Sequence, residues 1–246
     1  MKTVYMRFYE ELNDFLSSNK RKLRFPCPFQ GRVSIKDLIE SIGVPHIEID
    51  LILVNGKSVG FGYIVNDQDD ISICPVFESF DIKDAQHLRP KPLREPKFIL
   101  DVKLGSLTKY MRMLGFDSAY KNSYSENEII ILSINERRTI LTKDRNILKR
   151  NDVAHGYWIR NIKIIDQVKE VTRRFQLNNL IQPFSRCMKC NIQLIQTEKE
   201  NIIDRLEENT RNLFEKFFIC PSCSQIYWKG SHYQKMLDTI NDIRES

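Results

Sequence analysis

The segment Phe98–Tyr120, FILDVKLGSLTKYMRMLGFDSAY, decides the fold of the second half of the chain. A short apolar run ends at an aspartate, apolar residues then recur at helical spacing, and Gly115 stops the helix before a second apolar run. The next segment, Ser125–Arg150, SENEIIILSINERRTILTKDRNILKR, continues with a capped helix and a further short strand. Strands that alternate with helices in this way predict an α/β domain on an open parallel sheet.

Two aspartates in these segments follow apolar strands and precede helical stretches. Asp101 comes directly after FIL, and Asp144 follows TILTK. Ligands of open parallel sheets bind beyond the carboxyl ends of the strands, where neighbouring strand ends can bring two carboxylates together. Such carboxylates repel unless a cation lies between them, so the pattern indicates a Mg²⁺ or Mn²⁺ site that activates water at a phosphodiester. Capping of the following helix explains each aspartate equally well.

The charge of the chain is unevenly distributed. Its 246 residues carry a net charge of +6, but residues 1–82 hold 9 basic and 12 acidic residues, whereas residues 98–180 hold 15 basic and 9 acidic ones. From charge alone, a solvated charged face is the favoured interpretation. The coincidence of basic residues with both aspartates favours a nucleic-acid hydrolase, because lysine and arginine contact phosphates while carboxylates hold a metal ion. The candidate nucleic-acid-binding residues are Lys103, Lys109, Arg112, Lys143, Arg145 and Arg150.

Residues 1–82 predict a separate small domain. Strand patterns at 4–9 and 23–29 precede a helix that Ser34 caps and Gly43 ends, and the turn Asn55-Gly56 precedes a last strand at 71–77. This order of strands around one helix indicates an α+β domain of the ubiquitin-like β-grasp type. Residues 83–96 hold prolines and charges, and they predict an extended linker to a nuclease-like domain at 97–180.

The N-terminal domain resembles the β-grasp sulfur carriers in two runs, DLIESIGVPHIEIDLILVNG at 37–56 and DDISICPVF at 69–77. Sulfur carriers act through a free C-terminal Gly-Gly. Here the last strand runs into Glu78 and the linker instead, so carrier chemistry is not expected. The domain is expected to dock a protein partner or to serve as a scaffold.

Two C-x₂-C pairs, Cys187/Cys190 and Cys220/Cys223, are separated by 29 residues. In a cytosolic chain, thiolates at this spacing predict a Cys₄ zinc site rather than disulfides. A redox role is disfavoured because two such pairs occur and neither opens a thioredoxin-like helix. Four thiolates leave no open position on the metal, so the zinc is expected to be structural. Residues 181–246 therefore predict a zinc ribbon followed by a C-terminal helix.

The run from Lys97 to about Met236 resembles the RNase domain named after the C-terminal part of the Mut-seven exonuclease, through the two segments quoted first. That family is regarded as a variant of the PIN nuclease fold with an appended zinc ribbon, and a fused β-grasp domain also fits it. The resemblance implies metal-dependent RNA cleavage, with Asp101 as the first strand-end acid and Asp144 as the acid of a T-x-D motif.

PIN sites usually hold three or four acids, so further candidates are needed. Glu126 and Glu128 occupy the segment that supplies another acid in the family. Asp117 also fits the pattern, although a turn residue before a strand is more often structural, and Asp152 is a remaining candidate. Near the C-terminus, residues 225–236, QIYWKGSHYQKM, interleave aromatic rings with cations. These rings either stack unpaired bases or pack the ribbon onto the nuclease domain, and packing is slightly favoured.

The sequence thus favours a divalent-metal-dependent, PIN-like ribonuclease with a structural Zn²⁺ and an accessory β-grasp domain. A non-catalytic RNA-binding or translation-associated module is the alternative, and a sulfur-transfer scaffold is less favoured. The longest apolar runs fall short of a membrane span, and the first residues, MKTVYMRFYEEL, lack a signal peptide's apolar stretch. A cytoplasmic protein that binds RNA and no membrane is therefore expected.

Overall fold

The computed structural model describes residues 1–75 and 96–245. The predicted linker at 83–96 therefore falls outside the described residues, apart from Pro96. The chain divides into two compact units. The first joins the N-terminal residues to the segment Asp144–Trp158, and the second joins Glu95–Lys143 to Ile159–Ser246. The inclusion of Asp144–Trp158 in the first unit was not indicated by the sequence.

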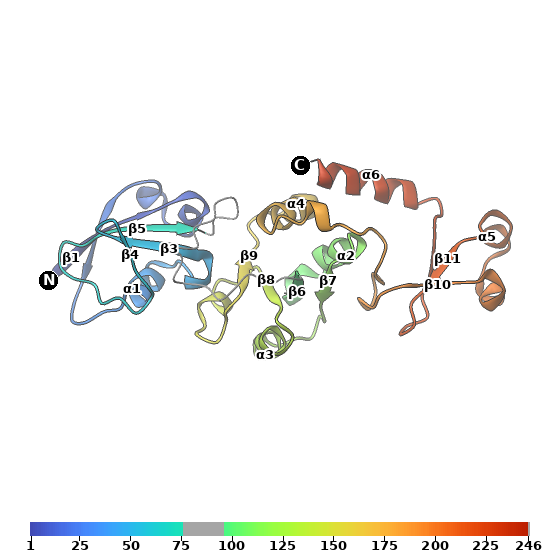
Figure 1. The fold of residues 1–246 in the computed structure, drawn as a ribbon, viewed down its shortest axis with the longest axis horizontal. Helices are drawn as coiled ribbons and strands as arrows, with labels where there is room; N and C mark the ends of the chain where they lie inside the picture. Colours follow the sequence, from blue (N-terminus) through green and yellow to red (C-terminus); the bar gives the residue numbers. More distant parts are fainter. Residues whose placement is uncertain (76–95, 246) are drawn as a thin grey trace. The chain divides into compact units, whose positions relative to one another are not determined.

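The first unit is built on a five-stranded sheet, and it has one α-helix among its described residues (Figure 1). The strand order is β2-β1-β5-β3-β4, with β1 and β5 parallel and the other pairs antiparallel. The elements are β1 (Lys2–Phe8), β2 (Phe25–Phe29), α1 (Ile35–Ile42), β3 (Ile49–Val54), β4 (Lys57–Ser58) and β5 (Asp70–Pro75), with short 3₁₀ helices η1 (Glu10–Phe15), η2 (Ser18–Lys20) and η3 (His46–Glu48).

Local signals explain where these elements start and stop. The Ser34 hydroxyl accepts a hydrogen bond from the backbone N–H of Asp37 and so caps α1, and Gly43 ends the helix with φ of +110°. Asn55 and Gly56 both have positive φ, as the tight turn between β3 and β4 requires. The α+β fold predicted for this part of the chain is confirmed.

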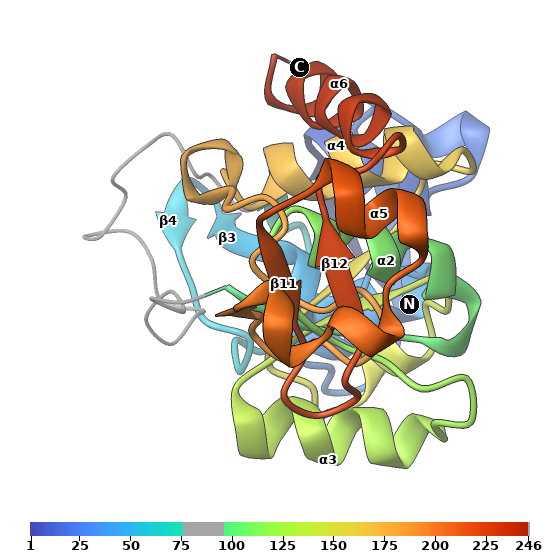
Figure 2. The ribbon, with the colours of Figure 1, turned by 90° about the vertical axis from the view of Figure 1, so that its right-hand side faces the viewer.

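The second unit begins with three parallel strands in the order β7-β6-β8. Its elements are β6 (Lys97–Leu100), η4 (Val102–Leu104), α2 (Gly105–Met113), β7 (Asp117–Ala119), α3 (Glu126–Glu136), β8 (Thr139–Thr142) and α4 (Ile164–Arg174). Figures 1 and 2 show α3 and α4 on opposite sides of these strands. The predicted open parallel sheet with helices is confirmed.

A three-stranded antiparallel ribbon, in the order β10-β11-β12, completes the second unit. It comprises β10 (Ile195–Thr197), the helix α5 (Glu208–Leu213), β11 (Phe217–Ile219) and β12 (Ile226–Trp228), with the 3₁₀ helices η7 (Lys199–Asn201) and η8 (Ile203–Arg205). The 3₁₀ helix η6 (Asn178–Leu180) lies between α4 and the ribbon in the chain. Ile202, Leu206, Phe217 and Ile226 form its small apolar core. The last helix, α6 (Tyr233–Arg244), contacts α4.

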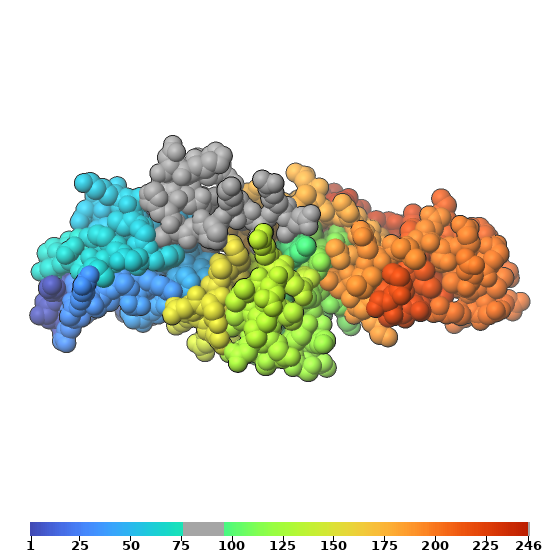
Figure 3. Space-filling view, turned by 60° about the horizontal axis from the view of Figure 1, so that its bottom comes forward, coloured from blue at the N-terminus to red at the C-terminus, as the bar shows by residue number. Residues whose placement is uncertain are grey.

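The remaining short elements, η5 (Ile147–Lys149) and β9 (Gly156–Trp158), belong to the Asp144–Trp158 segment of the first unit. Figure 3 shows α3 at the surface of the molecule. Ile131 and Ile134 of this helix are both more than half exposed. In the part of the chain that the structure describes, no helix is both long enough and apolar enough to cross a membrane.

Candidate active site and metal centre

Asp101 follows directly on β6 and is 6% exposed. Its Oδ2 accepts hydrogen bonds from the Thr142 hydroxyl at 2.5 Å and from the backbone N–H of Lys143 at 2.7 Å. Its Oδ1 accepts a hydrogen bond from the backbone N–H of Lys103 at 2.8 Å, which caps η4. Three donors on two strand ends therefore fix this buried carboxylate in one orientation.

Asp144 comes two residues after β8 and belongs to the first unit. It is half-buried, and its Oδ1 accepts a hydrogen bond from the backbone N–H of Asn146 at 2.9 Å. This bond closes a turn in which the side chain substitutes for a backbone carbonyl. Each aspartate thus follows a strand and also accepts a hydrogen bond from the backbone two residues later. Their shared role as metal ligands stays a prediction.

The two glutamates predicted to supply a further acid lie in the first turn of α3 and are exposed. Ser125 and Glu128 form a capping box, in which the carboxylate accepts hydrogen bonds from the backbone N–H of Ser125 at 2.8 Å and from its hydroxyl at 2.7 Å. These bonds lower the pKa of Glu128. Glu128 therefore has a structural role, and catalysis by Glu126 or Glu128 stays a prediction.

Two of the predicted RNA-binding lysines, Lys103 and Lys109, are exposed and can reach a polyanion. Lys143 is half-buried, and its Nζ donates a hydrogen bond to the backbone carbonyl of Asn161. Burial lowers the pKa of Lys143, and neighbouring carboxylates offset this effect only in part.

Arg145 and Arg150 have partners within the first unit. The Arg145 guanidinium lies 3.7 Å from the centroid of the Trp158 ring and 5.2 Å from that of Phe15. Arg150 forms an ion pair with Asp152 at 2.8 Å, which lowers the pKa of Asp152. These contacts hold both guanidinium groups, and phosphate binding by them stays a prediction.

Arg112 differs from the expectation that it faces solvent and contacts phosphate, because it is only 5% exposed. Its Nε donates a hydrogen bond to the carbonyl of Ser118 at 2.9 Å, and its Nη1 donates to those of Lys189 at 2.8 Å and Met188 at 3.2 Å. Helical spacing places Arg112 away from the apolar stripe of α2, but the ribbon packs on that side of the helix. We therefore assign Arg112 to joining the ribbon to the parallel sheet.

Asp117 supports the same junction. It pairs with Arg138, accepts a hydrogen bond from the Asn191 side chain at 2.7 Å, and lies 3.6 Å from an Arg186 nitrogen. Burial raises the pKa of Asp117, but the hydrogen bonds with Arg138 and Asn191 outweigh burial and hold that pKa below its ordinary value. The structure therefore supports the structural alternative for Asp117. No local sequence signal identified Arg138 or Asn191 as its partners.

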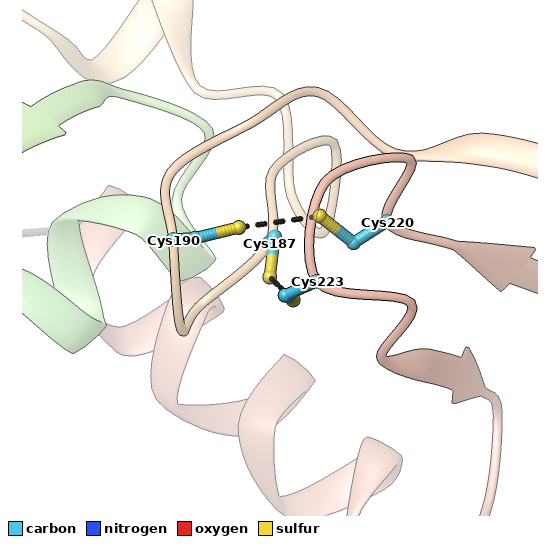
Figure 4. A group of neighbouring side chains, drawn as sticks. All are labelled: Cys187, Cys190, Cys220 and Cys223. Atoms are coloured by element: carbon cyan, nitrogen blue, oxygen red, sulfur yellow. Dashed lines mark hydrogen bonds between the residues drawn. The ribbon is translucent and has the colours of Figure 1, made fainter.

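The four cysteines of the C-x₂-C pairs converge at one place (Figure 4). The Sγ atoms of Cys187 and Cys223 are 3.6 Å apart, those of Cys190 and Cys220 are 3.2 Å apart, and all four lie within 4.8 Å of one another. Among residues 1–75 and 96–245, this is the one group of three or more side chains that could hold a metal ion. The predicted cysteine cluster is confirmed.

Both cysteine pairs lie in the same kind of turn. The backbone N–H of Asn191 donates to the carbonyl of Cys187 at 2.9 Å, and that of Ser224 donates to the carbonyl of Cys220 at 2.9 Å. Asn191 and Ser224 both have positive φ, which brings the chain around sharply after each pair. Tyr227 places its hydroxyl 3.2 Å from the Sγ of Cys187. The loops are therefore built to present four sulfur atoms inward.

The donor set fits a tetrahedral zinc ion. Zinc–sulfur bonds of about 2.3 Å place the sulfur atoms of a tetrahedron about 3.8 Å apart. The observed separations of 3.2 and 3.6 Å are close to that value. Four soft sulfur ligands with no carboxylate among them suit zinc better than Mg²⁺ or Ca²⁺.

The aromatic residues near the C-terminus pack within the second unit. Trp228 contacts Phe217 in the ribbon core, with ring centroids 6.4 Å apart. Tyr233 lies against Phe184, with ring centroids 4.8 Å apart. These contacts favour packing over base stacking for these rings, although Trp228 is 39% exposed.

A groove of about 320 Å³ lies between residues of α2, the first cysteine loop and α6. Its lining combines methionines with cationic side chains, and Lys109 and Lys235 are exposed. The lining residues are Lys109, Tyr110, Met113, Met188, His232, Lys235, Met236 and Thr239.

A ubiquitin-like sheet joined in one chain to an α/β domain with a four-cysteine ribbon defines a two-domain class of protein. The model of the Mut7-C RNAse domain matches residues 96–240, and that of the Mut7-C ubiquitin domain matches residues 1–81. The chain therefore belongs to the Mut7-C RNase domain family and carries the Mut7-C ubiquitin domain before it. This confirms the resemblance found in the sequence. Searches of curated proteins and of solved structures found no match.

Proposed function

We propose that this protein is a divalent-metal-dependent ribonuclease of the PIN-like type that hydrolyses RNA phosphodiesters. Membership of a nuclease family supports this function. The observation that carries the proposal is Asp101, which is a buried carboxylate at the end of a parallel strand inside the matched region. Hydrogen bonds from three donors orient it, as neighbouring groups orient a metal-binding carboxylate.

Asp101 and Asp144 are the residues that we propose to hold Mg²⁺ or Mn²⁺. Carboxylate oxygens are the ligands that these hard cations prefer. When bound, the ion would supply an activated water and neutralise charge that develops on the phosphodiester. The Thr142 hydroxyl and the Lys143 backbone N–H keep the Asp101 carboxylate aligned. Glu126 is proposed as a further catalytic acid and not as a ligand of the ion, because Glu128 is engaged in the capping box.

Exposed lysines on the second unit are proposed to bind the RNA backbone. Lys103 lies in η4, two residues after Asp101, and Lys109 lies on α2, six residues after Lys103. Lys109 also lines the groove together with Lys235. Phosphate contacts of this kind position a strand without reading its sequence, so we expect salt-dependent binding with little base preference.

The four cysteines are proposed to hold a structural Zn²⁺. The first cysteine loop also supplies the carbonyls of Met188 and Lys189 that accept hydrogen bonds from Arg112. Zinc binding in small finger peptides contributes about 10–16 kcal/mol to folding. Loss of the metal is therefore expected to unfold the ribbon and to release the groove side chains that it positions.

A non-catalytic RNA-binding module is the second candidate. One observation favours it: Asp101 and Asp144 each accept a hydrogen bond from the backbone N–H two residues later. Asp101 thereby caps η4 and Asp144 closes a turn, so a structural role is sufficient to explain both side chains. The lysines and the ribbon would then serve binding alone.

The experiment that separates the two functions is incubation of the full chain with labelled single-stranded and structured RNAs. Reactions would contain Mn²⁺, Mg²⁺ or EDTA at matched ionic strength. Cleavage that requires Mn²⁺ or Mg²⁺ and stops in EDTA supports the nuclease. Stable RNA binding without cleavage under every metal condition supports the binding module.

A further inference from the structure

Trp158 is the largest side chain of the Asp144–Trp158 segment, and it packs against the hydrophobic core of the first unit. Its ring centroid lies 5.0 Å from that of Phe15 at the end of η1, with the rings tilted by 45°. The Arg145 guanidinium lies 3.7 Å from the same tryptophan ring. Trp158, at the end of the segment, therefore contacts both Phe15 of the core and Arg145 from the start of the segment.

Polar contacts fix the backbone of this segment as well. The backbone N–H of Trp158 donates to a carboxylate oxygen of Glu48 at 2.9 Å, and Glu48 is 1% exposed. Lys36 on α1 donates from its Nζ to the Asn151 side chain at 2.7 Å. The hydrogen bond from Trp158 to the buried Glu48 carboxylate fixes the position of the segment along η3. A shift of the segment by one residue would remove this donor from the buried carboxylate.

Contacts between secondary-structure elements involve the same residues as these hydrogen bonds. The 3₁₀ helix η3, which ends at Glu48, contacts both η5 and β9. The segment has little regular structure of its own, since η5 and β9 contain three residues each. Packing against residues of the N-terminal sheet and its helices therefore contributes to its conformation.

We propose that the surface formed by Phe15, Lys36 and Glu48 has the Asp144–Trp158 segment of the same chain as its partner. This ubiquitin-like surface is thus occupied from within the chain. Its consequence rests on the proposed function: the ubiquitin-like domain acts as a positioning element for the loop that begins at Asp144. Glu48 and Phe15 are positioning residues that act on Asp144 through this loop.

Hydrogen exchange of the full chain, read by mass spectrometry, tests the surface without reference to activity. Glu48→Ala is expected to raise exchange in residues 144–158 at least about tenfold, because the segment loses its buried acceptor. Trp158→Ala is expected to raise exchange reciprocally around η1 and η3. Phe25→Ala is the matched control. It also removes an aromatic ring from this core, but Phe25 stacks on Phe8 within the sheet and not on the segment.

Unchanged exchange in 144–158 for Glu48→Ala, or an equal rise for Phe25→Ala, overturns the proposal. Cleavage and its Mn²⁺ dependence are then measured on the same samples. Glu48→Ala is expected to need at least about tenfold more Mn²⁺ for half-maximal cleavage while RNA affinity stays the same. An unchanged Mn²⁺ requirement despite faster exchange overturns the positioning role.

Failure of the proposed function gives a different result. If the wild-type chain cleaves no RNA with any metal, the nuclease function fails, whereas the exchange of Glu48→Ala and Trp158→Ala still decides whether the surface binds the segment.

Discussion

Replacement of Arg112 by methionine tests whether this arginine joins the ribbon to the parallel sheet. Methionine keeps an unbranched side chain but removes the guanidinium that donates to the carbonyls of Ser118, Met188 and Lys189. A hydrogen bond to a charged group contributes about 1.5–3 kcal/mol. Desolvation of the buried guanidinium offsets part of the three bonds, so the free energy of unfolding of the second unit is expected to fall by about 3–5 kcal/mol.

That loss is a large share of a typical domain stability of about 5–15 kcal/mol. Urea unfolding followed by tryptophan fluorescence measures it. The chain has two tryptophans, so in a Trp158→Phe background Trp228 alone reports the ribbon. Lys109→Met on the same helix is the matched control, because Lys109 is exposed and its loss is expected to cost less than about 0.5 kcal/mol.

RNA affinity measured on the same two variants separates structure from binding. Lys109→Met is expected to weaken RNA binding at unchanged stability, and Arg112→Met to lower stability. The reasoning is refuted if Arg112→Met unfolds within about 0.5 kcal/mol of its parent and weakens RNA binding as Lys109→Met does. Arg112 would then be a phosphate contact, as the sequence pattern suggested.

Three further outcomes are expected. Cys187→Ser should abolish the stoichiometric zinc that metal quantitation finds in the purified chain, whereas Cys27→Ser in β2 should leave the zinc content unchanged. A folded wild-type ribbon without metal would contradict the zinc assignment. Lys109→Ala combined with Lys235→Ala should reduce the slope of log RNA affinity against log salt by about 2, and an unchanged slope would remove the groove from the RNA path. Asp117 has a lowered pKa in the folded chain, so its contribution to stability is present above its ordinary pKa and is lost as the pH falls through the lowered value. The stability difference between wild type and Asp117→Asn, measured by urea unfolding, should therefore be on the order of 1–3 kcal/mol at pH 6 and should shrink toward pH 2; a difference that grows on acidification would contradict this ion-pair account.

Short-range patterns predicted the elements well. Ser34 and the Asn55-Gly56 turn act through bonds within a few residues, and alternating strands and helices indicated the parallel sheet. The two C-x₂-C pairs identified the cysteine cluster for the same reason, since each pair occupies a turn that its own backbone closes.

Contacts between distant segments could not be predicted in this way. The stacking of Trp158 on Phe15 and the bond from its backbone to Glu48 join residues more than 100 positions apart in the chain. Helical spacing identified the apolar face of α2 correctly but could not show that the ribbon covers Arg112 on another side. Glu128 is a different case, because Ser125 three residues earlier is a capping-box signature that was open to recognition in the sequence.

The central claim is that strand-end carboxylates hold the ion that hydrolyses RNA. Its most direct test is the cleavage rate of Asp144→Asn and Asp101→Asn at saturating Mn²⁺, with RNA affinity and the circular dichroism spectrum measured on the same protein. Because Asp101 is buried among three donors and its amide would oppose some of them, Asp144→Asn is the better folded variant. We predict that both variants bind RNA as the wild type does and cleave it at least about 100-fold more slowly. Folded variants that cleave at the wild-type rate would contradict the account.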